Sequence, residues 1–295
     1  MSYIDIIKKK HGIKELLVLE GGYSFDEKYH YYNENHFVLK IHNISEKNKI
    51  LDKVSRMEEL YSIGVKCPRV IFYGFVEEFD KCYTIFSFIE GETGDAVTKY
   101  SKELQYKIGV SSGKELKLIH SIESEKEIDI FKVFTKKFER IYSEFKELSC
   151  SIIKENLIVE FIRNNLYILK DRKAQFLHGD FHLENSVFDE NGYIGCYDFN
   201  RCKYSDYVIE FERASVFSRS FSLEYVIGLF DGYGFTKDEF IVLRLYLAMG
   251  LFNSVVWTYK YYPEQMDDND SLIEMILEDY DDFKLEVPKY YSKRC

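Results

Sequence analysis

The sequence predicts an α+β fold of two lobes, in which a small lobe with an antiparallel sheet and one helix precedes a larger, mainly helical lobe. The chain of 295 residues is longer than a single hydrophobic core usually supports. Its first part alternates short apolar runs with turn residues, as strands do, and the remainder carries long apolar patterns at helical spacing. We therefore divide the chain into residues 1–90 and residues 91–295.

The small lobe is predicted to hold five strands and one main helix after a short leading helix. The expected strands are residues 15–20, 28–33, 36–42, 68–75 and 82–88. The turn Gly21-Gly22-Tyr23-Ser24 separates the first strand from the second, and Asn33-Glu34-Asn35 forms the turn between the second and the third. Residues 45–62 place apolar side chains at helical spacing after Ser45, which is a good N-cap residue.

The larger lobe is predicted to begin after the linker Glu90-Gly91-Glu92-Thr93-Gly94. Its expected helices are residues 102–119, 131–148 and 152–169, its expected strands are 176–178 and 193–197, and the rest is helical. The longest uncharged run, residues 245–259, is too short to span a bilayer and indicates a buried helix.

Composition limits the partners and the compartment. A net charge of −10 disfavours nucleic-acid binding, which needs clustered Lys and Arg, and favours cationic partners. The six cysteines form no CxxC pair, which is typical of thiols in a reducing compartment. Residues 1–14 lack the apolar core of a secretory signal. We expect a cytoplasmic protein without a membrane or nucleic-acid partner.

Two loops at predicted strand ends carry oxygen-bearing side chains. The first is His178-Gly179-Asp180-Phe181-His182-Leu183-Glu184-Asn185, and Asp198-Phe199-Asn200 begins thirteen residues after Asn185. Phosphoryl transfer needs a carboxylate that orients the acceptor hydroxyl and accepts its proton, and oxygen ligands that hold Mg²⁺ against the phosphates. Asp180 suits the first role, and Asn185 and Asp198 suit the second.

The segment HGDFHLEN with the downstream YDFN resembles the signature of the aminoglycoside phosphotransferase and choline-kinase superfamily, which is HxDxxxxN followed by a hydrophobic-Asp pair. This resemblance implies a protein-kinase-like fold. It also implies transfer of the γ-phosphoryl group of ATP or GTP, with Mg²⁺, to a hydroxyl of a small-molecule acceptor. The resemblance is sharp over roughly thirty residues around Asp180.

The same resemblance implies a nucleotide site in the small lobe. Lys40, within the apolar strand 37–41, would pair with the α- and β-phosphates. Gly22 and Ser24 would lie over the phosphates and donate hydrogen bonds. Backbone groups of Ser87 and Ile89 would bind the purine edge.

A helix carboxylate is expected to pair with Lys40, and Asp52 fits the family's position best. Glu58 and Glu59 remain alternatives. The segment Asp206-Tyr207-Val208-Ile209-Glu210-Phe211 resembles the family's Asp-Pro-x-x-Glu-Phe segment with its proline replaced. Asp206 and Glu210 are therefore expected to support the scaffold through ion pairs or capping.

The kinases that this sequence resembles use aminoglycosides, choline-like or ethanolamine-like amines, macrolides, thiamine and sugars as acceptors. We expect an amine-bearing acceptor, first of all an aminoglycoside-type antibiotic, which would make the protein an antibiotic-resistance enzyme. Asp267, Asp268 and Asp270 belong to an acidic late segment that would attract a polycation. Trp257 and nearby tyrosines would add cation-π contacts. A solvated acidic surface is the alternative interpretation of this segment.

Three rival functions can be weighed from the sequence. Gly109-Val110-Ser111-Ser112-Gly113 matches a hydrolase GxSxG elbow, but it lies inside a continuous helical pattern instead of between a strand and a helix. His178, Asp180 and His182 could form a metallohydrolase cluster. The third rival is a kinase-like binding or regulatory module without activity, which the complete set of kinase residues argues against.

Overall fold

The computed structural model of the chain describes residues 1–19 and 27–292. They form two compact units, and the fold is the predicted α+β fold. The first unit comprises Met1–Glu92 with Ile194–Tyr197, and the second comprises Thr93–Tyr193 with Asp198–Cys295. The short return of residues 194–197 to the first unit is anchored by the amide of Cys196, which donates to the carbonyl of Lys66 at 2.9 Å.

The first unit contains the predicted antiparallel five-stranded sheet. Its strands are β1 (Leu17–Val18), β2 (Glu27–Asn33), β3 (Asn35–Asn43), β4 (Val70–Val76) and β5 (Lys81–Ser87), in the order β1-β2-β3-β5-β4. The tight turn between β2 and β3 uses Glu34 at φ 62°. The first strand was predicted over residues 15–20, and within the described residues only Leu17–Val18 pair with β2.

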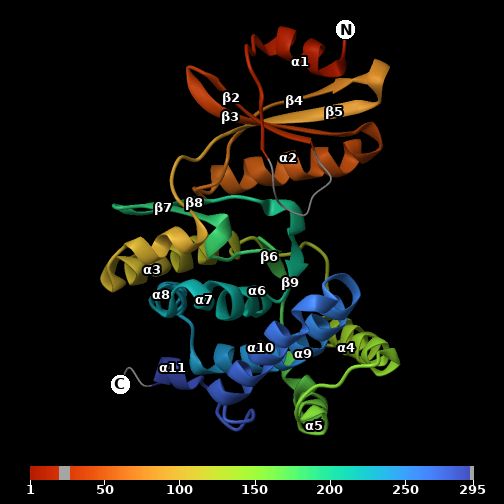
Figure 1. Cartoon of the computed structure of the whole chain (residues 1–295), viewed down its shortest axis with the longest axis vertical. Helices are drawn as coiled ribbons and strands as arrows, with labels where there is room; N and C mark the ends of the chain where they lie inside the picture. The colour runs from red at the N-terminus through yellow and green to blue at the C-terminus, as the bar shows by residue number, and fades with distance from the viewer. Residues whose placement is uncertain (20–26, 293–295) are drawn as a thin grey trace. The chain divides into compact units, whose positions relative to one another are not determined.

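Two helices cover opposite faces of this sheet (Figure 1). From α1 (Tyr3–His11), Ile7 packs in one cluster with Leu39 of β3. From α2 (Lys47–Ser62), Ile50 and Val54 pack with Cys82 in a second cluster. Because neighbouring strand residues point to opposite faces, the sheet is covered on both sides and its middle strands are buried.

The second unit is mainly helical. Its helices are α3 (Lys102–Ile119), α4 (Ile130–Glu147), α5 (Glu155–Asn165), α6 (Glu210–Arg213), α7 (Arg219–Phe221), α8 (Leu223–Tyr233), α9 (Lys237–Tyr261), α10 (Met266–Asp279) and α11 (Lys289–Ser292). A single π-helical turn, η8 (Ala214–Ser218), joins α6 to α7. The predicted helix 152–169 is shorter than expected: α5 begins at Glu155, and the last predicted turn, Leu166–Leu169, is a 3₁₀ helix.

Short strands hold the loops that follow them. The strand β6 (Gln175–Leu177) pairs with β9 (Lys203–Ser205), and β7 (Ser186–Asp189) pairs with β8 (Gly192–Cys196). Strands were predicted at β6 and β8, but not at their partners β9 and β7. Both missed strands are too short, at three and four residues, to show a periodic pattern.

The helix α9 is the central core helix of the second unit. It starts at Lys237, eight residues before the uncharged run that indicated a buried helix. The residues before that run also contribute to the core, since Phe240 and Leu243 are buried. By length and composition it is the one described helix that could cross a membrane, and 72% of its most apolar window is buried inside the protein.

The helices α3 and α8 approach closely through glycines. A Cβ atom on Gly109 or Gly113 would lie 2.1 or 2.2 Å from a carbonyl oxygen of α8, and one on Gly228 or Gly232 would lie 2.2 or 2.0 Å from one of α3. The GxSxG pattern therefore serves helix packing, and the prediction that it is no nucleophile elbow is confirmed.

Candidate functional site

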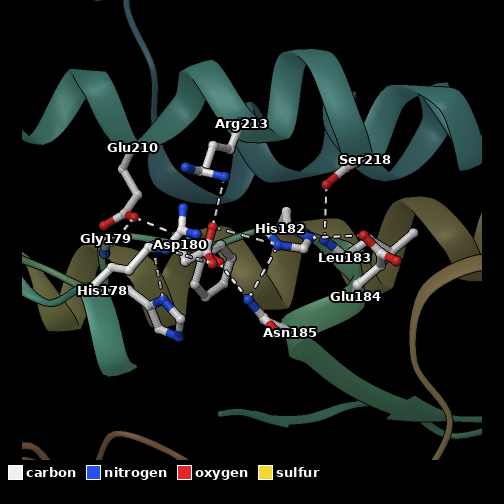
Figure 2. A network of polar contacts seen from close by, with 12 residues as sticks. His178, Gly179, Asp180, His182, Leu183, Glu184, Asn185, Glu210, Arg213 and Ser218 are labelled. Carbon is white, nitrogen blue, oxygen red and sulfur yellow. Dashed lines mark hydrogen bonds and ion pairs between the residues drawn. The ribbon is translucent and has the colours of Figure 1, made fainter. Parts of the chain in front are cut away.

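The catalytic loop, defined here as residues 178–185, leaves β6 and is held by one buried carboxylate. Oε1 of Glu210 accepts hydrogen bonds from the amides of Gly179 at 2.8 Å and Phe181 at 3.3 Å, on either side of Asp180 (Figure 2). Its second oxygen lies 3.4 Å from Nε2 of His120. Burial opposes the charge of Glu210, but the hydrogen bond and charge of His120, with smaller contributions from His178 and the amide of Phe181, hold its pKa below the ordinary value.

Gly179 is required by the path of this loop. Its φ is +85°, a left-handed conformation that side chains disfavour, and a Cβ atom there would lie 2.0 Å from the carbonyl oxygen of Arg201. The backbone of the loop before Asp180 therefore lies directly against the backbone of the loop after Asp198.

Two arginines and a histidine surround the Asp180 carboxylate. Nη1 of Arg213 lies 2.9 Å from Oδ1, and Nε of Arg201 lies 3.7 Å from Oδ2. Nε2 of His182 lies 3.7 Å from Oδ1. Burial lowers the pKa of His182, although the charges of Asp180 and Glu184 act in the opposite direction. The imidazole is therefore neutral at pH 7, and the cations beside Asp180 are the two arginines.

Asn185 and Asp198 fit the donor set of a magnesium ion. Nδ2 of Asn185 donates to the carbonyl oxygen of Asp180 at 2.8 Å, so the amide oxygen is the end left for a ligand. Oδ1 of Asp198 is buried, and it has no hydrogen-bond partner among the residues that the structure describes. A buried carboxylate oxygen without a donor is costly unless a cation pairs with it. Asp198 takes a left-handed conformation, φ 68°, two residues after the end of β8.

The metallohydrolase alternative receives no support. The ring of His178 is buried between Phe181 and Phe199, at centroid distances of 5.5 and 4.2 Å, and its Nδ1 accepts the amide of Asp180 at 3.3 Å. Across the part of the chain that the structure describes, no group of three or more His, Cys, Asp or Glu side chains could hold a metal ion.

Asp206 has the predicted scaffold role. It caps the short helix after it by accepting the amide of Val208 at 3.1 Å, and its Oδ1 accepts from Nη2 of Arg172 at 2.8 Å. The hydroxyl of Tyr246, on α9, donates to Oδ2 at 2.8 Å. These bonds tie the segment before α6 to the core, and the scaffold expectation for Asp206 and Glu210 is confirmed.

The predicted nucleotide residues that the structure describes lie in the first unit. Lys40 is on β3, opposite Thr84 of β5, with its ammonium 5.9 Å from the ring centre of Phe86. Ser87 ends β5, and its amide donates to the carbonyl of Arg69 at 2.9 Å. Ile89 follows in the half-buried linker.

The remaining nucleotide residues are less constrained. Gly22 and Ser24 lie outside the described residues. Asp52 and Glu58 are exposed on α2, and Glu59 pairs with Arg56 of the same helix at 2.8 Å. The pairing of Lys40 with a carboxylate of α2 therefore stays a prediction.

The acidic late segment lies on α10. Asp267 and Asp270 are exposed, and of the Asp268 side chain no placement is described. Burial raises the pKa of the Cys150 thiol, and the charge of Asp270 nearby raises it further. Within the described residues, no hydrogen bond or ion pair of Asp267 or Asp270 reaches the catalytic loop. Trp257 packs on Tyr262 at 4.9 Å near the end of α9.

Arg213 and Ser218 are functional-site residues that were not predicted from the sequence. Both come from the segment 210–218, and Oγ of Ser218 accepts the amide of Leu183 at 2.9 Å (Figure 2). Arg213 follows Glu210 by three residues on a helix, so both side chains leave the same face. That spacing is the sequence signal that could have identified Arg213.

Comparison with known proteins gives one family and many similar folds. The family model described as "Phosphotransferase enzyme family" matches residues 15–243. No curated protein matches the sequence significantly.

Three solved structures illustrate the likeness of fold. An ADP-bound aminoglycoside phosphotransferase, APH(2'')-Ib, is 19% identical with a TM-score of 0.66, over 92% of this chain and 96% of that one. The gentamicin complex of APH(2")-IIa is 18% identical with a TM-score of 0.67, over 93% and 96%. An amicoumacin kinase with AMP-PNP, Ca²⁺ and Ami is 12% identical with a TM-score of 0.64, over 99% and 97%.

Proposed function

The chain belongs to the phosphotransferase enzyme family, and on that premise we propose that it transfers the γ-phosphoryl group of ATP or GTP to a hydroxyl of an amine-bearing small molecule, such as an aminoglycoside antibiotic. The family match alone supports the broader function of a small-molecule kinase. Residues 1–90 would bind the nucleotide, and residues 91–295 would carry the catalytic groups and the acceptor.

The observation that carries the proposal is the setting of Asp180. Its carboxylate is fixed on a loop whose backbone is clamped on both sides, and Asn185 is bonded to its carbonyl. A general base must be held within hydrogen-bond reach of the proton that it accepts. Asp180 would orient the acceptor hydroxyl and take its proton, since it is the carboxylate of the loop that is both anchored and partly exposed.

Asn185 and Asp198 would hold Mg²⁺, because they supply the amide oxygen and the unpartnered carboxylate oxygen described above. When bound, that ion would neutralise charge on the β- and γ-phosphates. Lys40 would bind the phosphates as a point charge. Ser87 and Ile89 would offer backbone groups to the purine.

The amine-bearing acceptor is supported by the net charge of −10 and by the acidic α10, which would raise the local concentration of a polycation. Of the three structures described above, one is named as an aminoglycoside phosphotransferase, and another is a complex with gentamicin. These likenesses motivate the choice of acceptors to test.

The test is a panel of aminoglycosides, other amine-bearing alcohols and neutral alcohols, assayed with ATP and with GTP for release of nucleoside diphosphate. We expect turnover with at least one amine-bearing acceptor. Calorimetry should show weaker binding of the magnesium-nucleotide complex to Asp198→Ala and to Lys40→Ala than to wild type. Unchanged nucleotide binding in both variants would refute the proposed nucleotide site, and binding without turnover of any acceptor would favour a regulatory module.

A further inference from the structure

The closest cation to the proposed base is Arg213. Its Nη1 atom lies 2.9 Å from Oδ1 of Asp180, whereas Nε of Arg201 lies 3.7 Å from Oδ2. The side chain of Arg213 is 34% exposed and that of Arg201 is 51% exposed. Ion pairs weaken with distance and with exposure, so Arg213 has the stronger hold on the carboxylate.

The Arg213 side chain is itself held in place. Its guanidinium lies 5.8 Å from the ring centre of Phe217, four residues later in the chain, and the same ring lies 6.2 Å from that of His182. The backbone of Arg213 ends α6 and leads into the π-helical turn η8. Such single π-helical turns often occur at functional sites, where they re-aim side chains.

One segment therefore fixes both the backbone and the side chain of Asp180. Glu210 bonds the amides before and after Asp180, Arg213 pairs with its carboxylate, and Ser218 accepts the amide of Leu183 (Figure 2). A carboxylate that is held through one oxygen has its other oxygen set in direction, because the group is planar.

We propose that Arg213 is a positioning residue: its charge, in an ion pair without hydrogen-bond alignment, holds the buried Oδ1 of Asp180. Oδ2, which has only the more distant Arg201 beside it, is left to accept the proton of the acceptor hydroxyl. This inference rests on the proposed kinase function. In the step, the hydroxyl proton moves to Oδ2 as the hydroxyl oxygen bonds to the γ-phosphorus. The bond from that phosphorus to the bridging oxygen breaks, and the nucleoside diphosphate leaves with the bonding electrons.

Steady-state kinetics of matched variants test this role. Arg213→Gln removes the charge and keeps much of the side chain, Arg213→Lys keeps the charge without the planar fork, and Arg140→Gln is the control. Arg140 is exposed on α4 and pairs with Glu144, so its variant makes the same change in net charge away from the site. A displaced catalytic group costs rate, and a shift of about 1 Å can cost about a hundredfold.

We expect Arg213→Gln to lower kcat about ten- to a hundredfold, within the range of a general-base contribution, while the nucleotide KM stays within about twofold. Arg213→Lys should recover part of kcat, and Arg140→Gln should match wild type. In an Asp180→Asn background, Arg213→Gln should cause no further loss. Two results would overturn the inference: a change in KM without a change in kcat, or a loss of kcat from Arg213→Gln in Asp180→Asn as large as its loss in wild type.

A stability cycle separates this inference from the proposed function. Tm is measured for wild type, Asp180→Asn, Arg213→Gln and the double variant, and no acceptor is needed. The pair predicts non-additive changes, because each single variant leaves one charge unpaired. Additive changes in Tm would refute the positioning role, even if the protein is an active kinase. Non-additive changes in a protein that turns over no acceptor would support the Asp180–Arg213 pair and count against the kinase function. If Arg213→Gln does not fold, Arg213→Lys is used for both measurements.

Discussion

The amide nitrogen of Gly179 lies 2.8 Å from Oε1 of Glu210, so a carboxylate 31 residues later in the chain fixes the backbone immediately before the proposed base. Glu210 and its neighbour His120 are both fully buried. A buried carboxylate that receives several donors supports a loop strongly, and removing it leaves those donors unpaired.

Glu210→Gln is expected to lower the free energy of unfolding at pH 7 by about 2–4 kcal/mol, because charge-assisted hydrogen bonds to two amides are weakened. Chemical denaturation measures this change. Asp129→Asn, at the exposed N-cap of α4, is the control and should cost about 1 kcal/mol or less. A loss for Glu210→Gln no larger than for the control would contradict the clamp.

The pH dependence of the same stability has a definite sign. The pKa of Glu210 is lower in the folded protein than its ordinary value of about 4.3. Its contribution is therefore fully present above pH 4.3 and is lost as the pH falls through the folded value. We expect wild type to lose stability more steeply than Glu210→Gln below about pH 4.3; parallel curves would contradict the lowered pKa.

Gly179→Ala is expected to displace the loop that follows Asp198, since its Cβ atom would collide with the carbonyl of Arg201. Binding of the magnesium-nucleotide complex, measured by calorimetry, should weaken along with kcat. Gly12→Ala is the matched control. Gly12 also has a positive φ, +64°, but nothing lies within 4 Å of its Cβ position, so that variant should cost only about 1–2 kcal/mol of backbone strain. Equal effects of the two variants would contradict the contact.

Neutralising the acidic segment tests the proposed acceptor. Asp267→Asn, Asp268→Asn and Asp270→Asn together should raise the KM of an amine-bearing acceptor and leave that of the nucleotide unchanged. The wild-type acceptor KM should also rise with salt up to about 0.15 M, where screening shortens to about 8 Å. A triple variant that behaves as wild type would make this segment ordinary surface.

The sequence predicted the parts of the fold with strong periodic patterns. The strands β2 to β5 and the helices α2, α3 and α4 were expected close to their observed bounds. Asp180 and Asn185 were expected together because they share one loop. The pairing of β6 with β9 joins residues distant in the chain through three-residue strands, which leave no pattern. Such pairings are decided by tertiary packing and not by local propensity.

The support of the base was harder to foresee. Glu210 was expected to serve the scaffold, but its bonds to Gly179 and Phe181 depend on a carboxylate reaching a loop across 29 to 31 residues. Arg213 looked like any charged residue of a short helix. Its role depends on the turn η8 and on the packing of Phe217, and neither has a sequence signature.

The most direct measurement of the central claim is the turnover of Asp180→Asn beside its nucleotide affinity. With the best acceptor of the panel, kcat is measured by nucleoside diphosphate release, and binding of the magnesium-nucleotide complex is measured by calorimetry in protein of native Tm. We expect kcat to fall by about 10² to 10⁴ while nucleotide binding stays within a few fold, because the base acts in the transition state. Turnover of the variant within a few fold of wild type would show that Asp180 is not the base.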